Sequence, residues 1–212
     1  MPSSSPSQRR FRLLLPFGVA LVAALLAVAW SFHVRNGGQA SLGSFGAVPP
    51  FSLTERNGKT ITNHDLDGKI WVADFIFTTC PGPCPLISAS MARLQSKLAG
   101  DPRVQLVSFT VDPQDDTPSV LSAYANQLGA DPQRWWFLTG PEKSLYDLIR
   151  NGFYQTVQDN HGQTLEPGQF VVSHSTYMAL VDAHGVKRGF YQGLDADDQA
   201  GLLKAIHQLE NE

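Results

Sequence analysis

The chain has 212 residues, 42% of them hydrophobic, and its 12 Phe, 5 Tyr and 4 Trp can build a core, which excludes low-complexity disorder over most of its length. The presence of only two cysteines excludes a disulfide-dense scaffold. The net charge is −3, but four of the 16 basic residues lie in the first 35 positions, so 12 basic groups face 19 acidic ones afterwards. This acidic remainder has no basic run, which argues against nucleic-acid binding.

The first predicted element is an N-terminal hydrophobic helix over residues 13–32. Three arginines precede this run, which has no charged residue and is followed by Arg35. Twenty helical residues span roughly 30 Å, the thickness of a bilayer core. We therefore expect residues 1–12 to form a cytoplasmic stub and residues 13–32 to form a single transmembrane anchor. The soluble domain would lie on the periplasmic side of the inner membrane.

Other interpretations of this segment remain open. Ala27-Val28-Ala29 resembles a signal-peptide cleavage site, and the start, rich in Ser and Arg, is also compatible with a mitochondrial presequence. The pair Arg9-Arg10 is only a weak twin-arginine signal, and a buried helix of the soluble domain is the least favoured alternative. Each of the export interpretations places the two cysteines in a compartment where thiols can oxidise.

Residues 33–48 are rich in glycine and small polar residues and predict a flexible linker. Beyond them, short apolar runs alternate with helical patterns, so residues 49–212 are predicted to form one α/β domain with a partly parallel sheet. The expected strands are 51–54, 70–77, 104–111, 135–138, 175–181 and 186–191. The expected helices are 85–98, 117–128, 141–149 and 195–209. Residues 151–172 predict a loop or a hairpin insertion.

The two cysteines, Cys80 and Cys84, lie where the apolar strand 70–77 ends and a helix begins. The carboxyl ends of parallel strands are where α/β folds place their sites, and a helix N-terminus favours the thiolate. At this i, i+4 spacing both sulfur atoms can face one point. Two such thiols can form a structural disulfide, exchange electrons with another dithiol, or bind a soft metal such as Cu(I). The spacing alone does not choose among these.

A two-cysteine metal site needs a further ligand, and the chain has six histidines. His174 is the strongest candidate, because it begins a predicted apolar strand; a hydrogen-bonded core histidine is the alternative. The other histidines are expected at surface positions or, for the first of them, at the membrane interface: His33, His64, His161, His184 and His207.

Other polar and aromatic residues have simpler interpretations. Asp112 directly follows a strand and is interpreted as a turn former that could reach the top of the sheet, and Asp116 as a residue that caps or precedes a helix. The segment Trp135-Trp136-Phe137 is expected in the core. The sequence contains no catalytic serine motif, glycine-rich phosphate loop or HExxH motif, so hydrolase and nucleotide-dependent functions have no support.

These features together resemble the Sco/SenC family of copper chaperones over about residues 49–209. Four blocks carry the resemblance. They are Phe77-Thr-Thr-Cys80-Pro-Gly-Pro-Cys84-Pro85, Thr110-Val-Asp112-Pro113-Gln-Asp-Asp116-Thr117-Pro118, Phe137-Leu-Thr-Gly140, and Val172-Ser-His174-Ser-Thr followed by Leu180-Val-Asp-Ala-His-Gly185. The chain departs from the common family pattern at Gly82, Pro83, Asp115 and Ser173.

The resemblance implies a thioredoxin-like fold on a membrane anchor, with copper held by Cys80, Cys84 and His174. It implies Cu(I) as the bound ion and leaves Cu(II) open. It also implies a role in assembling the binuclear copper site of cytochrome c oxidase, by copper delivery or by thiol reduction. The expected partners are the copper-site subunit of that oxidase and other copper or thiol carriers.

An exported thiol-disulfide oxidoreductase that uses Cys80 and Cys84 without metal is the main alternative, so the sequence does not decide whether the protein is an enzyme. Thioredoxin-type enzymes place a proline opposite the dithiol. Around Ser173 to Ser175 there is none, and the nearest upstream proline is Pro167. This absence favours metal binding. A scaffold protein with a structural disulfide is the third hypothesis.

Overall fold

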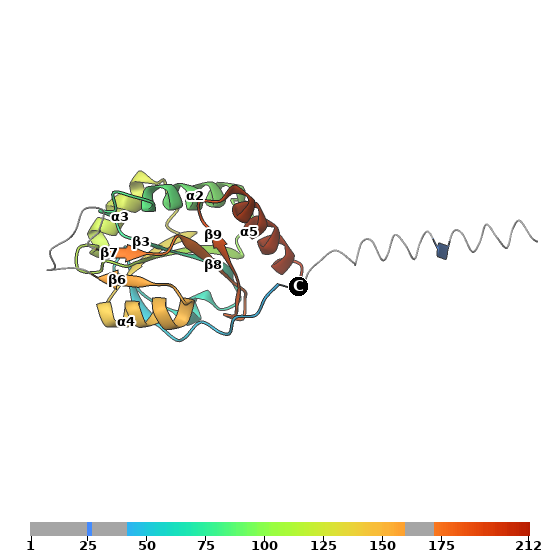
Figure 1. Ribbon diagram of the computed structural model, residues 1–212, viewed down its shortest axis with the longest axis horizontal. Helices are drawn as coiled ribbons and strands as arrows, with labels where there is room; N and C mark the ends of the chain where they lie inside the picture. Colours follow the sequence, from blue (N-terminus) through green and yellow to red (C-terminus); the bar gives the residue numbers. More distant parts are fainter. Residues whose placement is uncertain (1–24, 27–41, 160–171) are drawn as a thin grey trace, which may run out of the picture. The chain divides into compact units, whose positions relative to one another are not determined.

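The computed structural model describes residues 25–26, 42–159 and 172–212 (Figure 1). Leu25 and Leu26 are helical and exposed. The remainder of the predicted anchor, residues 13–24 and 27–32, lies outside the described residues. Among the helices that are described, none has the length and apolar character needed to span a membrane.

The folded domain is built on a seven-stranded mixed sheet with the order β2-β1-β5-β4-β3-β8-β9. The three central strands β3, β4 and β5 are parallel to one another, whereas β1, β2, β8 and β9 pair antiparallel. The strands are β1 (Ser52–Glu55), β2 (Thr60–Thr62), β3 (Ile70–Ile76), β4 (Val104–Thr110), β5 (Trp135–Thr139), β8 (Tyr177–Val181) and β9 (Lys187–Gln192). This arrangement confirms the predicted α/β class and its partly parallel sheet.

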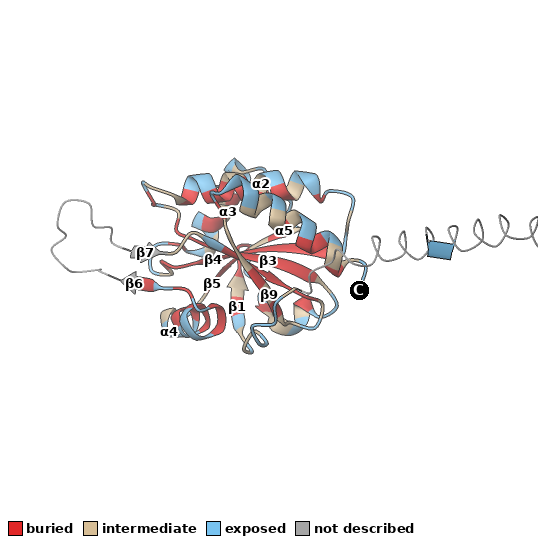
Figure 2. Ribbon diagram, turned by 45° about the vertical axis from the view of Figure 1, so that its right-hand side comes forward, coloured by how far each residue is buried: buried red, intermediate tan, exposed pale blue. Residues whose placement is uncertain are grey.

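Helices cover both faces of this sheet, with α2, α3 and α5 on one face and α4 on the other (Figure 1). Every residue of β3 and β4 is buried, as expected for central strands enclosed on both sides (Figure 2). The helices are α2 (Cys84–Lys97), α3 (Pro118–Gln127), α4 (Glu142–Asp147) and α5 (Ala196–Leu209), with a short 3-10 helix η1 (Asn63–Leu66) and a π-helical turn η2 (Leu148–Gly152).

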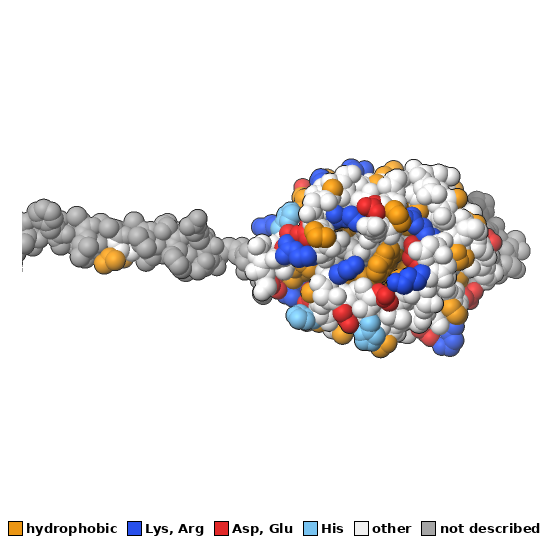
Figure 3. Space-filling model, turned by 180° about the vertical axis from the view of Figure 1, so that it is seen from behind, with side chains coloured by type: hydrophobic (Ala, Val, Ile, Leu, Met, Phe, Trp, Pro, Cys, Tyr) orange, Lys and Arg blue, Asp and Glu red, His pale blue; other side chains and the backbone are white. Residues whose placement is uncertain are grey.

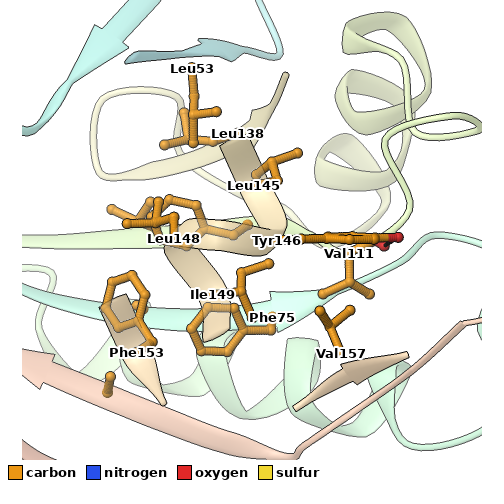
Figure 4. Packing of buried hydrophobic residues seen from close by; sticks show 14 of the residues in the cluster. Leu53, Phe75, Val111, Leu138, Leu145, Tyr146, Leu148, Ile149, Phe153 and Val157 are labelled. Atoms are coloured by element: carbon orange, nitrogen blue, oxygen red, sulfur yellow. Dashed lines mark hydrogen bonds between the residues drawn. The ribbon is translucent and has the colours of Figure 1, made fainter. Parts of the chain in front are cut away.

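Alternation along β3 divides the core in two. Val72 and Ile76 point toward α2, α3 and α5, whereas Trp71 and Phe75 point toward α4 and η2. On the α4 side, the rings of Phe75 and Phe153 lie 5.3 Å apart in an edge-to-face arrangement (Figure 4). The two cysteines belong to this second cluster.

Two predicted regions differ in detail from the structure. The strand expected at 51–54 is followed by a turn at Asn57-Gly58 and by a further strand, β2, that the pattern did not reveal because it is only three residues long. The region predicted as a loop or hairpin insertion at 151–172 starts within η2 and then contains β6 (Val157–Asp159), which pairs antiparallel with β7 (Val172–His174). This confirms a hairpin at its two ends, while residues 160–171 lie outside the described part.

Candidate dithiol and metal site

The cysteine loop connects β3 to α2 at the carboxyl end of the parallel strands, as predicted. The loop begins with a turn in which the backbone N–H of Cys80 donates to the carbonyl of Phe77 at 3.3 Å. Cys84 is the first residue of α2, and the carbonyl of Pro83 accepts the N–H groups of Leu86 and Ile87, both at 3.0 Å. The chain therefore places the second cysteine at a helix N-terminus.

Both cysteine side chains are buried. Cys80 is 9% exposed and Cys84 is 0% exposed, and no disulfide joins them. Burial raises the pKa of the Cys84 thiol, its hydrogen bond with the Cys80 side chain raises that pKa further, and a backbone hydrogen bond from Phe77 opposes the change. The pKa of the Cys84 thiol thus lies above its ordinary value although this residue begins a helix, because removal from water disfavours the charged thiolate.

His174 has a different local setting from the one predicted. It ends β7, opposite Val157 of β6, and does not begin the strand that contains Tyr177. Val157 itself packs in the same buried cluster as the two cysteines. The side chain of His174 lies outside the described part of the structure. Among the described side chains, no group of three His, Cys, Asp or Glu residues is placed to hold a metal ion.

The remaining described histidines are at the surface. The side chain of His64 is 79% exposed and lies 3.0 Å from the Asp67 carboxylate, and that of His207 is 56% exposed and lies 2.8 Å from Glu210. His184 is exposed in the turn between β8 and β9. His33 and His161 lie outside the described residues. The described histidines other than His174 are thus placed as the sequence analysis expected.

Asp74 is a buried carboxylic acid that the sequence analysis did not single out. It lies in the middle of β3, is 0% exposed, and accepts a hydrogen bond of 2.5 Å from the Ser108 hydroxyl. The Ser108 oxygen in turn accepts the indole N–H of Trp135 at 2.8 Å. Burial raises the pKa of Asp74 to about 7, and its charge when ionised raises the pKa of the Cys84 thiol. In the sequence, the feature that could have revealed this residue is that Asp74 is the single acid within the apolar run IWVADFIF.

Residues 111–117, which join β4 to α3, form the Asp-Pro loop, and this loop is hydrogen-bonded to the cysteine loop. Asp112 is 2% exposed, and its backbone N–H donates to the Thr110 hydroxyl at 2.9 Å. Asp116 lies two residues before α3, as expected of a residue that precedes the helix, and Thr117 is the residue that caps it. The Asp116 carboxylate instead accepts the Thr78 hydroxyl from the cysteine loop at 2.5 Å.

A mixed sheet with helices on both faces, and a buried dithiol at the start of the helix that follows a central parallel strand, defines a thioredoxin-like protein. The family model described as SCO1/SenC matches residues 40–210. The chain belongs to the SCO1/SenC family.

Individual relatives agree with this assignment. The chain is 33% identical over 162 residues to the SCO1 protein homolog of Bacillus subtilis, covering 74% of this chain and 84% of the relative. BsSco, described as a member of the Sco family of cytochrome c oxidase assembly proteins with a disulfide switch, has a TM-score of 0.66 and 27% identity, covering 80% and 98% of the two chains. Arabidopsis thaliana ScoI with copper bound has a TM-score of 0.64 and 25% identity, covering 77% and 99%.

Proposed function

We propose that this protein binds copper and acts in the assembly of the binuclear copper site of cytochrome c oxidase. The observation that carries the proposal is the pair of buried cysteines, Cys80 and Cys84, whose side chains are hydrogen-bonded to each other in a SCO1/SenC chain. Thiolates are soft ligands that select Cu(I). Copper is the cargo, and Arabidopsis thaliana ScoI, a relative of this chain, has been solved with copper bound.

The proposed ligands are the thiolates of Cys80 and Cys84 and the imidazole of His174. Register supports the histidine: β7 pairs His174 with Val157, and Val157 packs in the cluster that contains both cysteines. Binding requires loss of the thiol protons, so copper competes with protons at this site. A three-ligand site leaves one approach open for the ligands of a receiving protein.

The same dithiol supports a second candidate function, reduction of a partner's disulfide. The side chains of Cys80 and Cys84 are hydrogen-bonded to each other, so the two sulfur atoms lie near one another. In that exchange the two thiols give two electrons and two protons to the partner, which becomes a dithiol, while Cys80 and Cys84 form a disulfide. The disulfide switch described for BsSco supports this alternative.

The anchor and the compartment belong to the same proposal. Residues 13–32 would cross the inner membrane once, with residues 1–12 in the cytoplasm and residues 49–212 in the periplasm as the copper-binding domain. The apolar run flanked by arginines supports this arrangement. A periplasmic domain would meet the copper-site subunit of the oxidase at the membrane surface.

An anaerobic Cu(I) titration of the reduced full-length chain against a competing chelator tests the ligand set. Cys80→Ser and Cys84→Ser are each expected to abolish tight binding, and His174→Ala to weaken it by at least tenfold, because each removes one of three ligands. His184→Ala, at an exposed turn of the same domain, is the matched control and should bind like the wild type. Absence of Cu(I) binding by the wild type would refute the copper function. Unchanged binding by His174→Ala would remove His174 from the ligand set.

A further inference from the structure

Asp116 is a fully buried carboxylate that joins two loops. It is 0% exposed, and its oxygens accept three donor groups. The backbone N–H of Thr78 lies 3.2 Å from each oxygen, and the hydroxyls of Thr78 and Thr110 each donate at 2.5 Å. Hydrogen bonds to a charged acceptor are about twice as strong as neutral ones. The contact links positions 38 residues apart in the sequence.

The residue that Asp116 holds lies in the cysteine loop itself. Thr78 is the second residue of the turn that the Cys80 N–H closes on the Phe77 carbonyl. Pro81 and Pro83, further along the same loop, have no backbone N–H with which to anchor it. The hydrogen bonds that Thr78 donates to Asp116 therefore connect the first half of this loop to Asp116, and Asp116 is in turn bonded to Thr110 at the end of β4.

Hydrogen bonds to Thr110 and Asp112 fix the position of Asp116 itself. The Thr110 hydroxyl donates to Asp116 and accepts the backbone N–H of Asp112, at 2.5 and 2.9 Å. The backbone N–H of Asp116 donates to the Asp112 carbonyl at 2.9 Å. A side chain fixed in this way transmits the position of the Asp-Pro loop to the cysteine loop.

We propose that Asp116 is a positioning residue of the dithiol site: its carboxylate holds Thr78 so that the Cys80 thiol stays within reach of Cys84. As applied to copper, this inference rests on the proposed function, but as applied to the dithiol it does not. Without the carboxylate, the cysteine loop would spend only part of the time in the conformation that allows disulfide formation or copper binding. The apparent affinity of a site falls in proportion to the fraction that is competent.

Two properties of the full-length chain test this proposal. One is the equilibrium constant for Cys80–Cys84 disulfide formation in a glutathione buffer, and the other is the Cu(I) affinity measured against a chelator. For Asp116→Asn we expect each to fall by about tenfold, the effect of losing one charge-assisted hydrogen bond. For a two-electron couple, tenfold corresponds to a rise of about 30 mV in the reduction potential.

Variants of Thr78 supply a rescue pair. Thr78→Val removes the hydroxyl and is expected to behave like Asp116→Asn, whereas Thr78→Ser keeps the hydroxyl and should keep both wild-type values. Asp65→Asn is the matched control, because Asp65 also accepts the N–H and hydroxyl of a threonine, Thr62, at 2.8 and 2.9 Å, but in β2 and η1. It should lower stability without moving the potential.

The outcomes separate the two proposals. If Asp116→Asn and Thr78→Val fold and keep the wild-type reduction potential and Cu(I) affinity, Asp116 has only a structural role and the inference is overturned. A shifted potential with no Cu(I) binding by the wild type would refute the copper function and leave the positioning role in place. If Asp116→Asn does not fold, the difference between Thr78→Val and Thr78→Ser decides.

Discussion

At the scale of single residues, Asp74 has the most unusual environment of the described acids. Its carboxyl oxygen Oδ1 is hydrogen-bonded to Ser108, whereas Oδ2 is buried without a hydrogen-bond partner among the described residues. An ionised carboxylate in such a place is costly, because a buried charge needs compensating partners. The neutral acid is therefore favoured in the folded protein, and the pKa rises from its usual 3.8 to about 7.

This shift predicts a pH dependence of stability. Between about pH 4 and pH 7 the folded protein keeps a proton on Asp74 that the unfolded chain has released, so stability falls as pH rises through that window. The loss by pH 8 is on the order of 4 kcal/mol, from about three pKa units. We expect Asp74→Asn to gain stability relative to wild type over this window, measured by urea unfolding at pH 4.5 and pH 8.

A control with the opposite sign is available. Hydrogen bonds from Thr62 lower the pKa of Asp65, so the carboxylate form stabilises the fold once Asp65 ionises. The stability of Asp65→Asn should therefore fall relative to wild type as pH rises through the acidic range. An Asp74→Asn variant whose stability difference from wild type is the same at both pH values would contradict the assignment of a neutral Asp74.

At the scale of elements, apolar periodicity predicted most of what the structure contains. The strand expected at 70–77 is β3, and the helix expected at 85–98 is α2, each within one residue at either end. The cysteine loop was therefore placed correctly between a buried strand and a helix. Long elements of this kind can be predicted from the sequence, because their buried positions are occupied by apolar residues at a regular spacing.

The parts that the sequence did not predict depend on contacts between distant residues. β7 has only three residues, too few for a period, and pairing with β6 defines it. The role of Asp116 depends on Thr78, which lies on another loop. The protonated state of Asp74 depends on burial beneath helices that come later in the chain. None of these contacts leaves a local pattern in the sequence.

Local signals at helix ends also lead to a prediction. The Asp195 carboxylate caps α5 by accepting the N–H groups of Asp197 and Asp198 at 2.9 and 2.8 Å. Asp195→Ala should lower the free energy of unfolding by about 1 kcal/mol, because these donors lose their partner. Asn at this position caps equally well, so Asp195→Asn should retain nearly all of the stability in the same denaturant titration. Equal loss in both variants would mean that charge, not capping, matters there.

At the scale of the whole molecule, the segment before β1 is attached to the turn before β9 and to the first residues of that strand. Residues 43–48 fall within the predicted linker, yet the N–H of Phe45 donates to the Lys187 carbonyl at 2.9 Å, and the N–H of Val48 to the Gly185 carbonyl at 2.9 Å. The Arg188 guanidinium donates to the Gly43 carbonyl at 2.9 Å. The segment therefore follows the folded domain for several residues before β1 begins.

The buried side chain of Lys187 contacts the segment of residues 43–48. Lys187 is 1% exposed, and its ammonium group donates to the carbonyls of Ala47 and Gly152, at 3.1 and 2.5 Å, and lies 4.6 Å from the centre of the Tyr154 ring. Among the described ion pairs, none involves Lys187. Burial lowers the pKa of this lysine. Two carbonyl dipoles and an aromatic face thus compensate a buried cation.

Lys187→Met should loosen the attached segment. We expect a loss of about 1–3 kcal/mol in unfolding free energy, because the buried Gly152 carbonyl and the partly buried contact at Ala47 lose their donor. We also expect faster proteolytic cleavage around residues 42–49. Lys69→Met is the control, since Lys69 also lies over an aromatic ring, Trp136, at 5.2 Å but is partly exposed. If the Lys187 variant were cut no faster than the control, the lysine would not be what holds the segment.

Charge is distributed without a dominant patch on the face shown in Figure 3, where Lys and Arg side chains are interspersed with acidic and hydrophobic ones. The acidic excess after residue 35 is therefore not offset there by a continuous basic surface. Association of this face with a partner would depend on local pairing of charges more than on a long-range field.

The attached segment has a further consequence for self-association. β9 is the last strand of the sheet, and an uncovered terminal strand presents unpaired N–H and C=O groups to which another chain can add. Phe45 and Gly46 occupy the backbone groups of Lys187, and Ala47 bridges Val186. At the opposite side the terminal strand β2 has only three residues. The protein thus limits intermolecular strand pairing at both margins of its sheet, because the segment before β1 covers the start of β9 and β2 is short.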